Sequence, residues 1–262
     1  MAMAATKDRV AVCLGKGGLP VGSLIYTKQG RRENTAFAYT EQWLGNAARF
    51  KVSSDLELIS NYQTRKASTE MDSAFPFALA DTAPDAWGRR VILRDHAKRR
   101  KKDAKLGELN ELDFLLAVDD FSRIGALRLK DEKGNFHRSV EEGRRGTPPL
   151  VDLEKIYTSS LAVETGNETE QDLAYLLGKG TSLGGMRPKC TVVDKNGMLA
   201  LGKFPSISDT RSITRGEVLA LHLAQAAGIE TANSRIEMVS GVAIAIIERF
   251  DRDETGGRIP YM

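Results

Sequence analysis

The last third of the chain holds an ordered series of segments that restricts the possible folds more than any other feature. It begins with a glycine-rich turn at residues 178–185. Two apolar runs follow, Cys190–Val193 and Met198–Lys203, with Asn-Gly in the turn between them. Asn-Gly between such runs is a strong hairpin signal, because both central residues of the tight turn need a positive φ. The spacing then predicts one helix and two strands, in the order 216–227, 234–239 and 242–250.

The first 130 residues are predicted to be rich in β-structure. Short apolar or alternating runs separated by glycine-containing turns are typical of strands, and they occur at 10–14, 21–26, 36–39 and 124–129. Two further stretches, 84–97 and 111–118, have helical spacing. In the first of these helices we expect Pro84 in the first turn, where its missing N–H costs nothing. Its buried side is expected to hold Trp87, Val91, Ile92 and Leu93.

A segment rich in helix and strand breakers divides the chain at 131–150. It joins the turn at 131–135 to a polar stretch that ends in two prolines. Helices are predicted after it, at about 151–163 and 169–178. We therefore expect an α+β protein with a β-rich subdomain at 1–130, a linker at 131–150 and a second unit at 151–262.

Composition excludes several classes of protein. The chain has 262 residues, of which 41% are hydrophobic and 28% charged, as is ordinary for a globular protein. No apolar run approaches the roughly 18 residues that span a bilayer, and the start lacks the apolar core of a signal peptide. Cys13 and Cys190 are the only cysteines, so we expect no disulfide framework. A cytoplasmic location is the prediction that follows. The three histidines have no partners at ligand spacing, which predicts no metal site among them.

A basic run, densest at 98–102, lies within 89–105. Such a run can contact the phosphates of nucleic acid. It is more often the solvated end of a helix, and a net charge of +3 does not favour a nucleic-acid binder by itself. The solvated helix end is the interpretation that we favour.

A glycine-rich turn, a strand ending in lysine and a helix with an early glutamate follow one another in the ATP-holding half of a protein kinase. Glycines let backbone N–H groups approach phosphate oxygens, and a lysine placed like Lys203 can reach α- and β-phosphates. The turn matches neither the P-loop nor Gly-x-Gly-x-x-Gly, so by itself it favours a flexible interdomain turn over a phosphate-binding loop. Lys203 by itself also fits a strand-end side chain that reaches out to solvent.

Two interpretations are open for Glu217. It can pair with Lys203, as the glutamate of the kinase helix pairs with the strand lysine. It can also close a capping box, because Thr214-Arg215-Gly216-Glu217 has the Thr-x-x-Glu spacing of a helix N-terminus.

Six segments together resemble the HipA family, the serine/threonine kinase toxins of bacterial toxin–antitoxin pairs. Those in the first block are Phe37-Ala38-Tyr39 with Trp43-Leu44, Pro84 to Arg90, and Arg123 to Leu127. Those in the second block are Ser182 to Lys189, Lys203-Phe204-Pro205, and Glu248 to Arg252. All six in this order make the resemblance specific. It implies a β-rich N-terminal subdomain packed on a protein-kinase-like N-lobe, which is an antiparallel sheet with helices.

The resemblance implies roles for the matched residues. Ser182 takes the position of the serine that such kinases autophosphorylate. The loop that covers the phosphates of ATP would contain Ser182, Leu183, Gly184, Gly185 and Lys189. Lys203 would hold the α- and β-phosphates, and Glu248 and Phe250 would offer backbone groups to adenine. ATP and Mg²⁺ are the implied cofactors.

The resemblance also implies an action and partners. The family phosphorylates an aminoacyl-tRNA synthetase, which stalls translation and leads to dormancy and persistence. Its usual partner is a HipB-like helix-turn-helix antitoxin, so DNA would be contacted only indirectly, through that antitoxin.

The chain departs from the family pattern in its catalytic motifs. Phosphoryl transfer needs an Asp to orient the hydroxyl and further ligands for Mg²⁺, which the family carries in His-x-Asp-x-x-x-x-Asn and a later Asp. None of the three histidines here is followed by Asp two positions on, and Asp120-Phe121-Ser122, which imitates the metal motif, precedes the glycine-rich turn. We therefore expect the N-terminal portion of such a kinase, without the catalytic C-lobe and with no catalytic residue or metal ligand present.

Two other functions are open. The first is a non-catalytic short form that binds an antitoxin or a separate C-lobe partner. The second, more distant, is a nucleic-acid binder that uses residues 89–105, which a steep loss of binding with salt would reveal.

Overall fold

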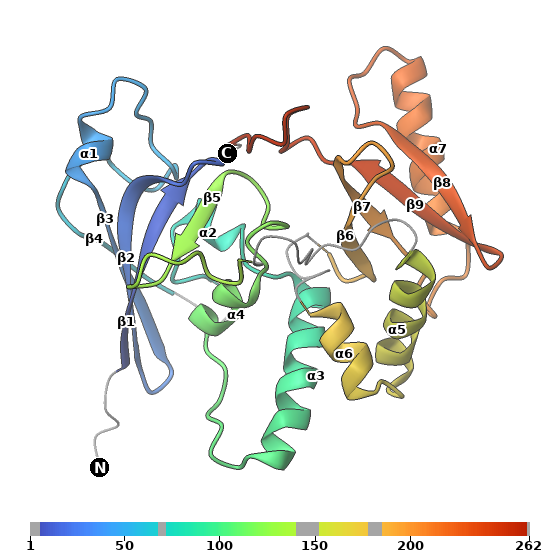
Figure 1. Cartoon of the computed structure of the whole chain (residues 1–262), viewed down its shortest axis with the longest axis horizontal. Coiled ribbons are helices and arrows are strands. Elements are labelled where there is room, and N and C mark those ends of the chain that lie inside the picture. Colours follow the sequence, from blue (N-terminus) through green and yellow to red (C-terminus); the bar gives the residue numbers. More distant parts are fainter. Residues whose placement is uncertain (1–5, 68–71, 140–151, 178–184, 261–262) are drawn as a thin grey trace.

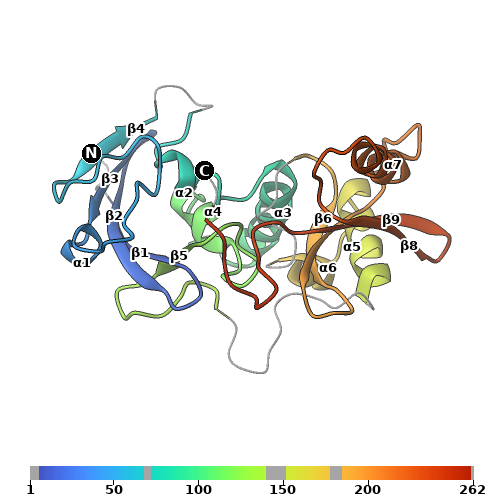
Figure 2. The ribbon, with the colours of Figure 1, turned by 90° about the horizontal axis from the view of Figure 1, so that it is seen from above.

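The computed structural model describes residues 6–67, 72–139, 152–177 and 185–260. They form two antiparallel sheets with helices between and beside them, as Figures 1 and 2 show. The predicted α+β class is therefore confirmed. In the described ranges no helix is long and apolar enough to cross a membrane.

The first sheet has the strand order β4-β3-β2-β1-β5. Its strands are β1 (Thr6–Leu14), β2 (Leu19–Gln29), β3 (Arg32–Tyr39), β4 (Gln63–Lys66) and β5 (Leu127–Lys130). Alternate residues such as Leu24 and Tyr26 are fully buried, because successive side chains of a strand point to opposite faces. Three helices contribute to the same core: α1 (Glu41–Leu44), α2 (Phe77–Ala80) and α4 (Glu111–Ala117).

The second sheet has the order β6-β7-β9-β8. Its strands are β6 (Lys189–Val193), β7 (Leu199–Lys203), β8 (Ser234–Val239) and β9 (Val242–Glu248). The helices α5 (Leu153–Thr165) and α6 (Glu170–Leu176) pack against it, and α7 (Ile213–Ala226) lies beside β8 and β9. Ile156, Leu173, Val192, Ile244 and Ile246 are among the residues of this second core.

The hairpin between β6 and β7 forms as predicted, but its turn differs. Its loop is longer than a two-residue turn, since Val193 pairs with Leu199. The N–H of Gly197 donates to the carbonyl of Asp194 at 2.9 Å. The N–H of Asp194 donates to the carbonyl of Met198 at 2.8 Å, which leaves a three-residue loop at 195–197. In this loop only the last residue, Gly197, has a positive φ, of 82°, as is usual for loops of this length.

The long helix α3 (Ala86–Lys102) stands between the two sheets (Figure 2). Trp87 and Val91, four residues apart, are buried in the second core although they belong to the first 130 residues. Two details of the predicted helix are wrong. Pro84 precedes the N-cap residue, Asp85, and Leu93 is 51% exposed. Leu93 lies six residues after Trp87, which at about 100° per residue turns its side chain away from the buried stripe.

The predicted division at 1–130, 131–150 and 151–262 stays a prediction. The last residues of the proposed linker, 140–150, lie outside the described residues. Because α3 completes the second core, the two parts of the chain depend on each other for packing.

A buried cluster of charged residues joins the C-terminal segment to the first sheet. After β9 the chain runs back from the second sheet toward the first, as Figure 2 shows. Asp251, 2% exposed, accepts hydrogen bonds from Arg249 Nη2 (2.6 Å), Arg252 Nη1 (2.6 Å) and the N–H of Gly125 (2.7 Å). Arg249 also donates to the carbonyl of Ser122 at 2.7 Å. The cluster thus ties residues 249–252 to the loop before β5.

Replacing Asp251 tests how much this cluster contributes. The Asp251→Asn substitution keeps the size of the side chain but leaves two buried guanidinium groups without their counter-ion. We expect the free energy of unfolding to fall by about 3 kcal/mol, as when a buried ion pair loses one partner. Urea unfolding measures this, with Glu254→Ala as the exposed control. A loss of less than 1 kcal/mol would contradict the assigned role.

The same cluster predicts an acid dependence. Burial raises the pKa of Asp251, but the hydrogen bonds and charges of Arg249 and Arg252 outweigh burial and lower it below its usual value. A carboxyl group with a lowered folded-state pKa stabilises the fold above its unfolded pKa of about 3.9 and loses that effect as the pH falls through the folded-state value. We expect the urea midpoint to fall more steeply below about pH 4 in the wild type than in Asp251→Asn.

Candidate nucleotide-binding site

Two lysines lie side by side at one end of the second sheet. Lys189 begins β6 and Lys203 ends β7, and the strand register places them directly opposite each other. Directly opposite residues of an antiparallel pair share one face of the sheet. Lys189 is 4% exposed, whereas the side chain of Lys203 is 30% exposed. We call these two residues the lysine pair.

Each member of the lysine pair has its own carboxylate. Lys203 forms an ion pair with Glu217, which comes from α7. Lys189 Nζ lies 2.6 Å from Oδ2 of Asp85, the N-cap residue of α3. The four side chains carry no net formal charge, so the repulsion between the two ammonium groups is compensated on both sides.

The geometry of α7 decides between the two interpretations of Glu217. The helix begins after Ser212, which makes no side-chain capping bond. Thr214 lies within the helix, where its hydroxyl group donates to the carbonyl of Ala243 at 2.8 Å. A capping box at 214–217 is therefore wrong, and Glu217 pairs with Lys203 instead.

Gly185 brings the end of the glycine-rich turn against the lysine pair. Its φ is +113°, and a Cβ atom added there would lie 3.0 Å from Lys189 Nζ. Its carbonyl accepts a hydrogen bond from the N–H of Trp87 at 3.3 Å. Glycine is favoured here because side chains rarely adopt this backbone angle, and because a Cβ atom would also displace the ammonium group slightly. Ser182, Leu183 and Gly184 lie outside the described residues.

Residues around the lysine pair are linked by further contacts. Arg187 forms an ion pair with Asp209, and the N–H of Phe204 donates to the carbonyl of Pro188 at 3.0 Å. These contacts connect the segment before β6 to the segment after β7. The ends of the two strands that carry Lys189 and Lys203 are thereby held together.

Glu248 and Phe250 lie farther along the sheet. Ala245 of β9 pairs with Lys203, whereas Glu248 pairs with Ala200. At about 3.3 Å per residue, Glu248 is therefore ~10 Å from the lysine pair along the strands. Its N–H donates to the carbonyl of Asn233 at 2.9 Å, and its carboxylate accepts from Asn233 Nδ2 at 2.8 Å. The ring of Phe250 is exposed. The adenine contacts assigned to Glu248 and Phe250 stay a prediction.

Burial shifts the pKa values of the inner ion pair. Burial lowers the pKa of Lys189, an effect that Asp85 opposes and the nearby Lys203 reinforces. Burial likewise raises the pKa of Asp85, although the Gly88 N–H and Lys189 act in the opposite direction. Both shifts disfavour the charged forms, and in each case the partner acts against the shift.

Such an arrangement is suited to holding phosphate groups. Two ammonium groups on one face of a sheet can each donate to phosphate oxygens, and charged hydrogen bonds of this kind are among the strongest in proteins. The residue that sequence reasoning missed is Asp85. The local sequence indicates only that Asp85 can be a helix N-cap. It does not indicate the ion pair, because Lys189 is 104 positions away in sequence.

The other candidate features are structural. The basic residues of α3 largely have acidic partners: Arg94 Nη1 lies 2.8 Å from Glu168 and Lys102 Nζ lies 2.6 Å from Glu170. This pairing agrees with a solvated helix end. Asp120 is buried and pairs with Arg128, with Nε to Oδ1 at 3.0 Å. Among the residues that the structure describes, no cluster of three His, Cys, Asp or Glu could hold a metal ion.

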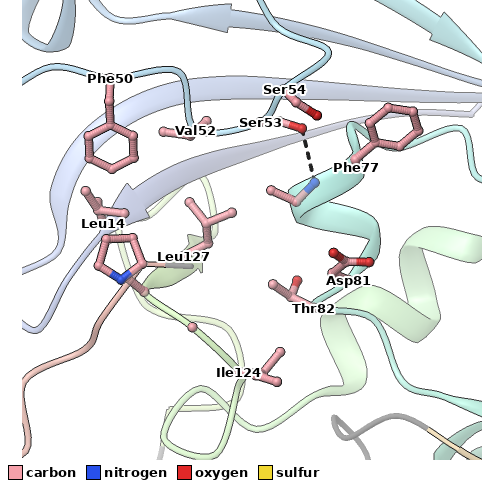
Figure 3. A pocket seen from close by; sticks show the side chains of 14 residues that line it. Leu14, Phe50, Val52, Ser53, Ser54, Phe77, Asp81, Thr82, Ile124 and Leu127 are labelled. Carbon is pink, nitrogen blue, oxygen red and sulfur yellow. Dashed lines mark hydrogen bonds between the residues drawn. The ribbon is translucent and has the colours of Figure 1, made fainter. Parts of the chain in front are cut away.

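A separate, mostly apolar pocket of about 110 Å³ opens beside the first sheet (Figure 3). Phe50, Phe77 and Leu127 form part of its wall, and Pro260 lines it from the C-terminal segment. Ser53 supplies polarity, but its hydroxyl oxygen already accepts a hydrogen bond from the N–H of Ala78 at 3.1 Å. This pocket contains none of the residues that sequence reasoning assigned to ATP.

Two family models match the chain. The HipA N-terminal domain covers residues 11–130 and the HipA-like C-terminal domain covers residues 181–262. The matched ranges include the elements that carry Asp85, Lys189, Lys203 and Glu217. The chain belongs to the HipA family.

A solved structure has a similar fold. It is HipA of Shewanella oneidensis MR-1, from a toxin–antitoxin system complex with HipB and operator DNA. The likeness covers 94% of this chain with a TM-score of 0.53 and 15% sequence identity. This chain spans 51% of the length of that HipA chain. No curated protein matches the chain.

Replacing Gly185 tests the close approach described above. The Gly185→Ala substitution puts a Cβ atom against Lys189 Nζ at a backbone angle that side chains rarely adopt. We expect a loss of about 2 kcal/mol in the free energy of unfolding. Urea unfolding measures it. Gly107→Ala is the matched control, because that position has open space and no positive φ. Equal stability of the two variants would contradict the assignment.

Proposed function

We propose that this chain is the nucleotide-binding portion of a HipA-type serine/threonine kinase. The observation that carries the proposal is the ion pair between Lys203, at the end of β7, and Glu217, near the start of α7. In protein kinases this pairing holds the lysine in position to contact the α- and β-phosphates of ATP.

The other residues of the site fit the same ligand. Lys189 adds a second ammonium group on the same face, and Gly185 lets the backbone approach it. The backbone at 248–250 would receive the adenine at the other end of the sheet. A Mg²⁺ ion bound with the nucleotide would neutralise part of the phosphate charge. The proposal also includes autophosphorylation of the kinase at Ser182.

The action of the whole protein extends the proposal. We infer a toxin that uses ATP to phosphorylate a protein such as an aminoacyl-tRNA synthetase. Its partner would be a helix-turn-helix antitoxin of the HipB kind, in keeping with the HipB-containing complex of the structural relative. DNA would then be contacted through the antitoxin.

One observation favours a second candidate function, that of a non-catalytic partner-binding form. The outward face of α7 is apolar: Leu219 is 58% exposed and Leu223, one turn later, is 61% exposed. A helix that is apolar on the side away from its own sheet is typical of one covered by another polypeptide. An antitoxin or a separate C-lobe partner would supply that cover.

Nucleotide binding tests the first proposal. We expect calorimetry with ATP and Mg²⁺ to show binding by the wild type. Lys203→Ala should weaken it at least tenfold, because a charged hydrogen bond to phosphate is worth about 1.5–3 kcal/mol.

The control for this experiment is Lys195→Ala, which removes a lysine that is exposed and lies in the β6–β7 turn. It should bind ATP like the wild type. Equal ATP affinity for Lys203→Ala and the wild type would contradict the proposal. Absence of binding by the wild type would leave the partner-binding form as the function that the site supports.

A further inference from the structure

Asp85 uses its two carboxylate oxygens for two different purposes. Oδ1 accepts a hydrogen bond from the N–H of Gly88 at 2.9 Å and so caps α3. Oδ2 accepts from Lys189 Nζ at 2.6 Å. The first turn of α3 makes a second contact with this region, because the N–H of Trp87 donates to the carbonyl of Gly185. The N-terminus of α3 is therefore joined to both Lys189 and the end of the glycine-rich turn.

The position of α3 is itself fixed. Trp87 is 1% exposed and Val91 is also 1% exposed, and both pack in the second core. A carboxylate on the residue before this helix is consequently held at a fixed place relative to β6. The side chain of Asp85 is only 11% exposed, so water competes weakly for its contact with Lys189.

The lysine pair needs such a carboxylate. Like charges directly opposite each other in a sheet repel. Glu217 compensates Lys203 from one side, and Asp85 compensates Lys189 from the other. The two ion pairs are built alike: in each, a helix supplies a carboxylate to a lysine at a strand end.

We propose that Asp85 is a positioning residue of the nucleotide site, which holds the ammonium group of Lys189 beside that of Lys203 so that both contact the phosphates. This inference rests on the proposed nucleotide-binding function and extends it. It makes the helix of the N-terminal part a component of the phosphate site, so that nucleotide binding is coupled to the position of α3.

The electrostatic surroundings support this role. The charged groups facing Lys189 in the described residues are Asp85 from α3, Lys203 from β7 and Glu217 from α7. Burial and Lys203 both lower the pKa of Lys189, and Asp85 is the closest group that raises it. Without Asp85 the ammonium group would lose its proton more easily, and its side chain would lose the hydrogen bond to Oδ2.

The Asp85→Asn variant isolates the charge. Asparagine caps helices as well as aspartate does, so α3 should keep its N-cap bond while Lys189 loses its counter-ion. We expect ATP to bind about tenfold more weakly, as when one charged hydrogen bond to phosphate is lost. Adenosine, which has no phosphate, should bind both proteins equally. The loss for ATP should grow as the pH rises, because removing Asp85 takes away a group that raises the pKa of Lys189.

Two further variants make the test specific. Asp95→Asn removes another carboxylate of α3, which pairs with Arg99 and not with the site, and should leave ATP binding unchanged. Lys189→Gln should weaken ATP binding about as much as Asp85→Asn. Adding Asp85→Asn to Lys189→Gln should then cause little further loss, because both substitutions remove the same contact. Should Asp85→Asn fail to fold, Asp85→Ser, which also keeps an oxygen acceptor for the cap and removes the charge, carries the test.

The outcomes separate this inference from the proposed function. If Lys203→Ala weakens ATP binding but Asp85→Asn binds ATP as tightly as the wild type, or more tightly, the role of Asp85 is overturned and the nucleotide site stands. Additive losses in the double variant would overturn it as well. If the wild type does not bind ATP, the proposed function fails and this inference fails with it.

Discussion

The burial of one face of α3 in the second core is the constraint on which the candidate site depends. Trp87 is among the largest fully buried side chains, and a tryptophan in such a place contributes several kcal/mol to stability. Because α3 cannot rotate or slide without exposing Trp87 and Val91, the residue before the helix has a fixed position. Asp85 occupies that position, and Lys189 is placed by it. The packing of apolar side chains thus determines where a buried charge lies.

The two lysine–carboxylate pairs differ in their exposure to water. The side chains of Lys203 and Glu217 are 30% and 33% exposed, whereas those of Lys189 and Asp85 are 3% and 11% exposed. A solvated pair contributes little to stability and can change partners at little cost. A buried pair costs much to break, because each charge would be left without compensation. The ion pair of Lys203 therefore costs less to exchange for a ligand than the ion pair of Lys189.

Local patterns were sufficient to predict much of the fold. Apolar and alternating runs located the strands of both sheets except β4, and Gly197 marked the hairpin. β4 was missed because Gln63–Lys66 contains no apolar residue. The turn type was missed because it depends on how far the strands remain paired, which the Asn-Gly pair alone does not determine. Leu93 was assigned to the wrong side of its helix because an apolar residue was taken as buried, although its angular position from Trp87 argued otherwise.

The candidate site was predictable in part, for a physical reason. Lys203 and Glu217 are close in sequence, so the order of strand and helix indicated their pairing. The competing capping box was excluded only by the structure, in which α7 begins after Ser212. Asp85 and Lys189 are joined only by the tertiary packing of α3. No local pattern at Pro84-Asp85-Ala86-Trp87 indicates anything beyond a helix start. A long-range ion pair between two parts of a chain is visible only once both cores are built.

The buried cluster of charged residues around Asp251 likewise joins the second sheet to the first part of the chain. It lies at the end of that sheet away from the lysine pair. Arg249 follows β9 directly, and its Nη1 donates both to Thr191 Oγ1 on β6, at 3.0 Å, and to the carbonyl of Ser122 in the first part of the chain. Residues 248–250 are thereby held against the loop before β5, as Lys189 is held against α3. The first part of the chain thus fixes both ends of the second sheet. A ligand that spans from the lysine pair to residue 248 would therefore lie, at both of its ends, beside segments that contact the first part of the chain.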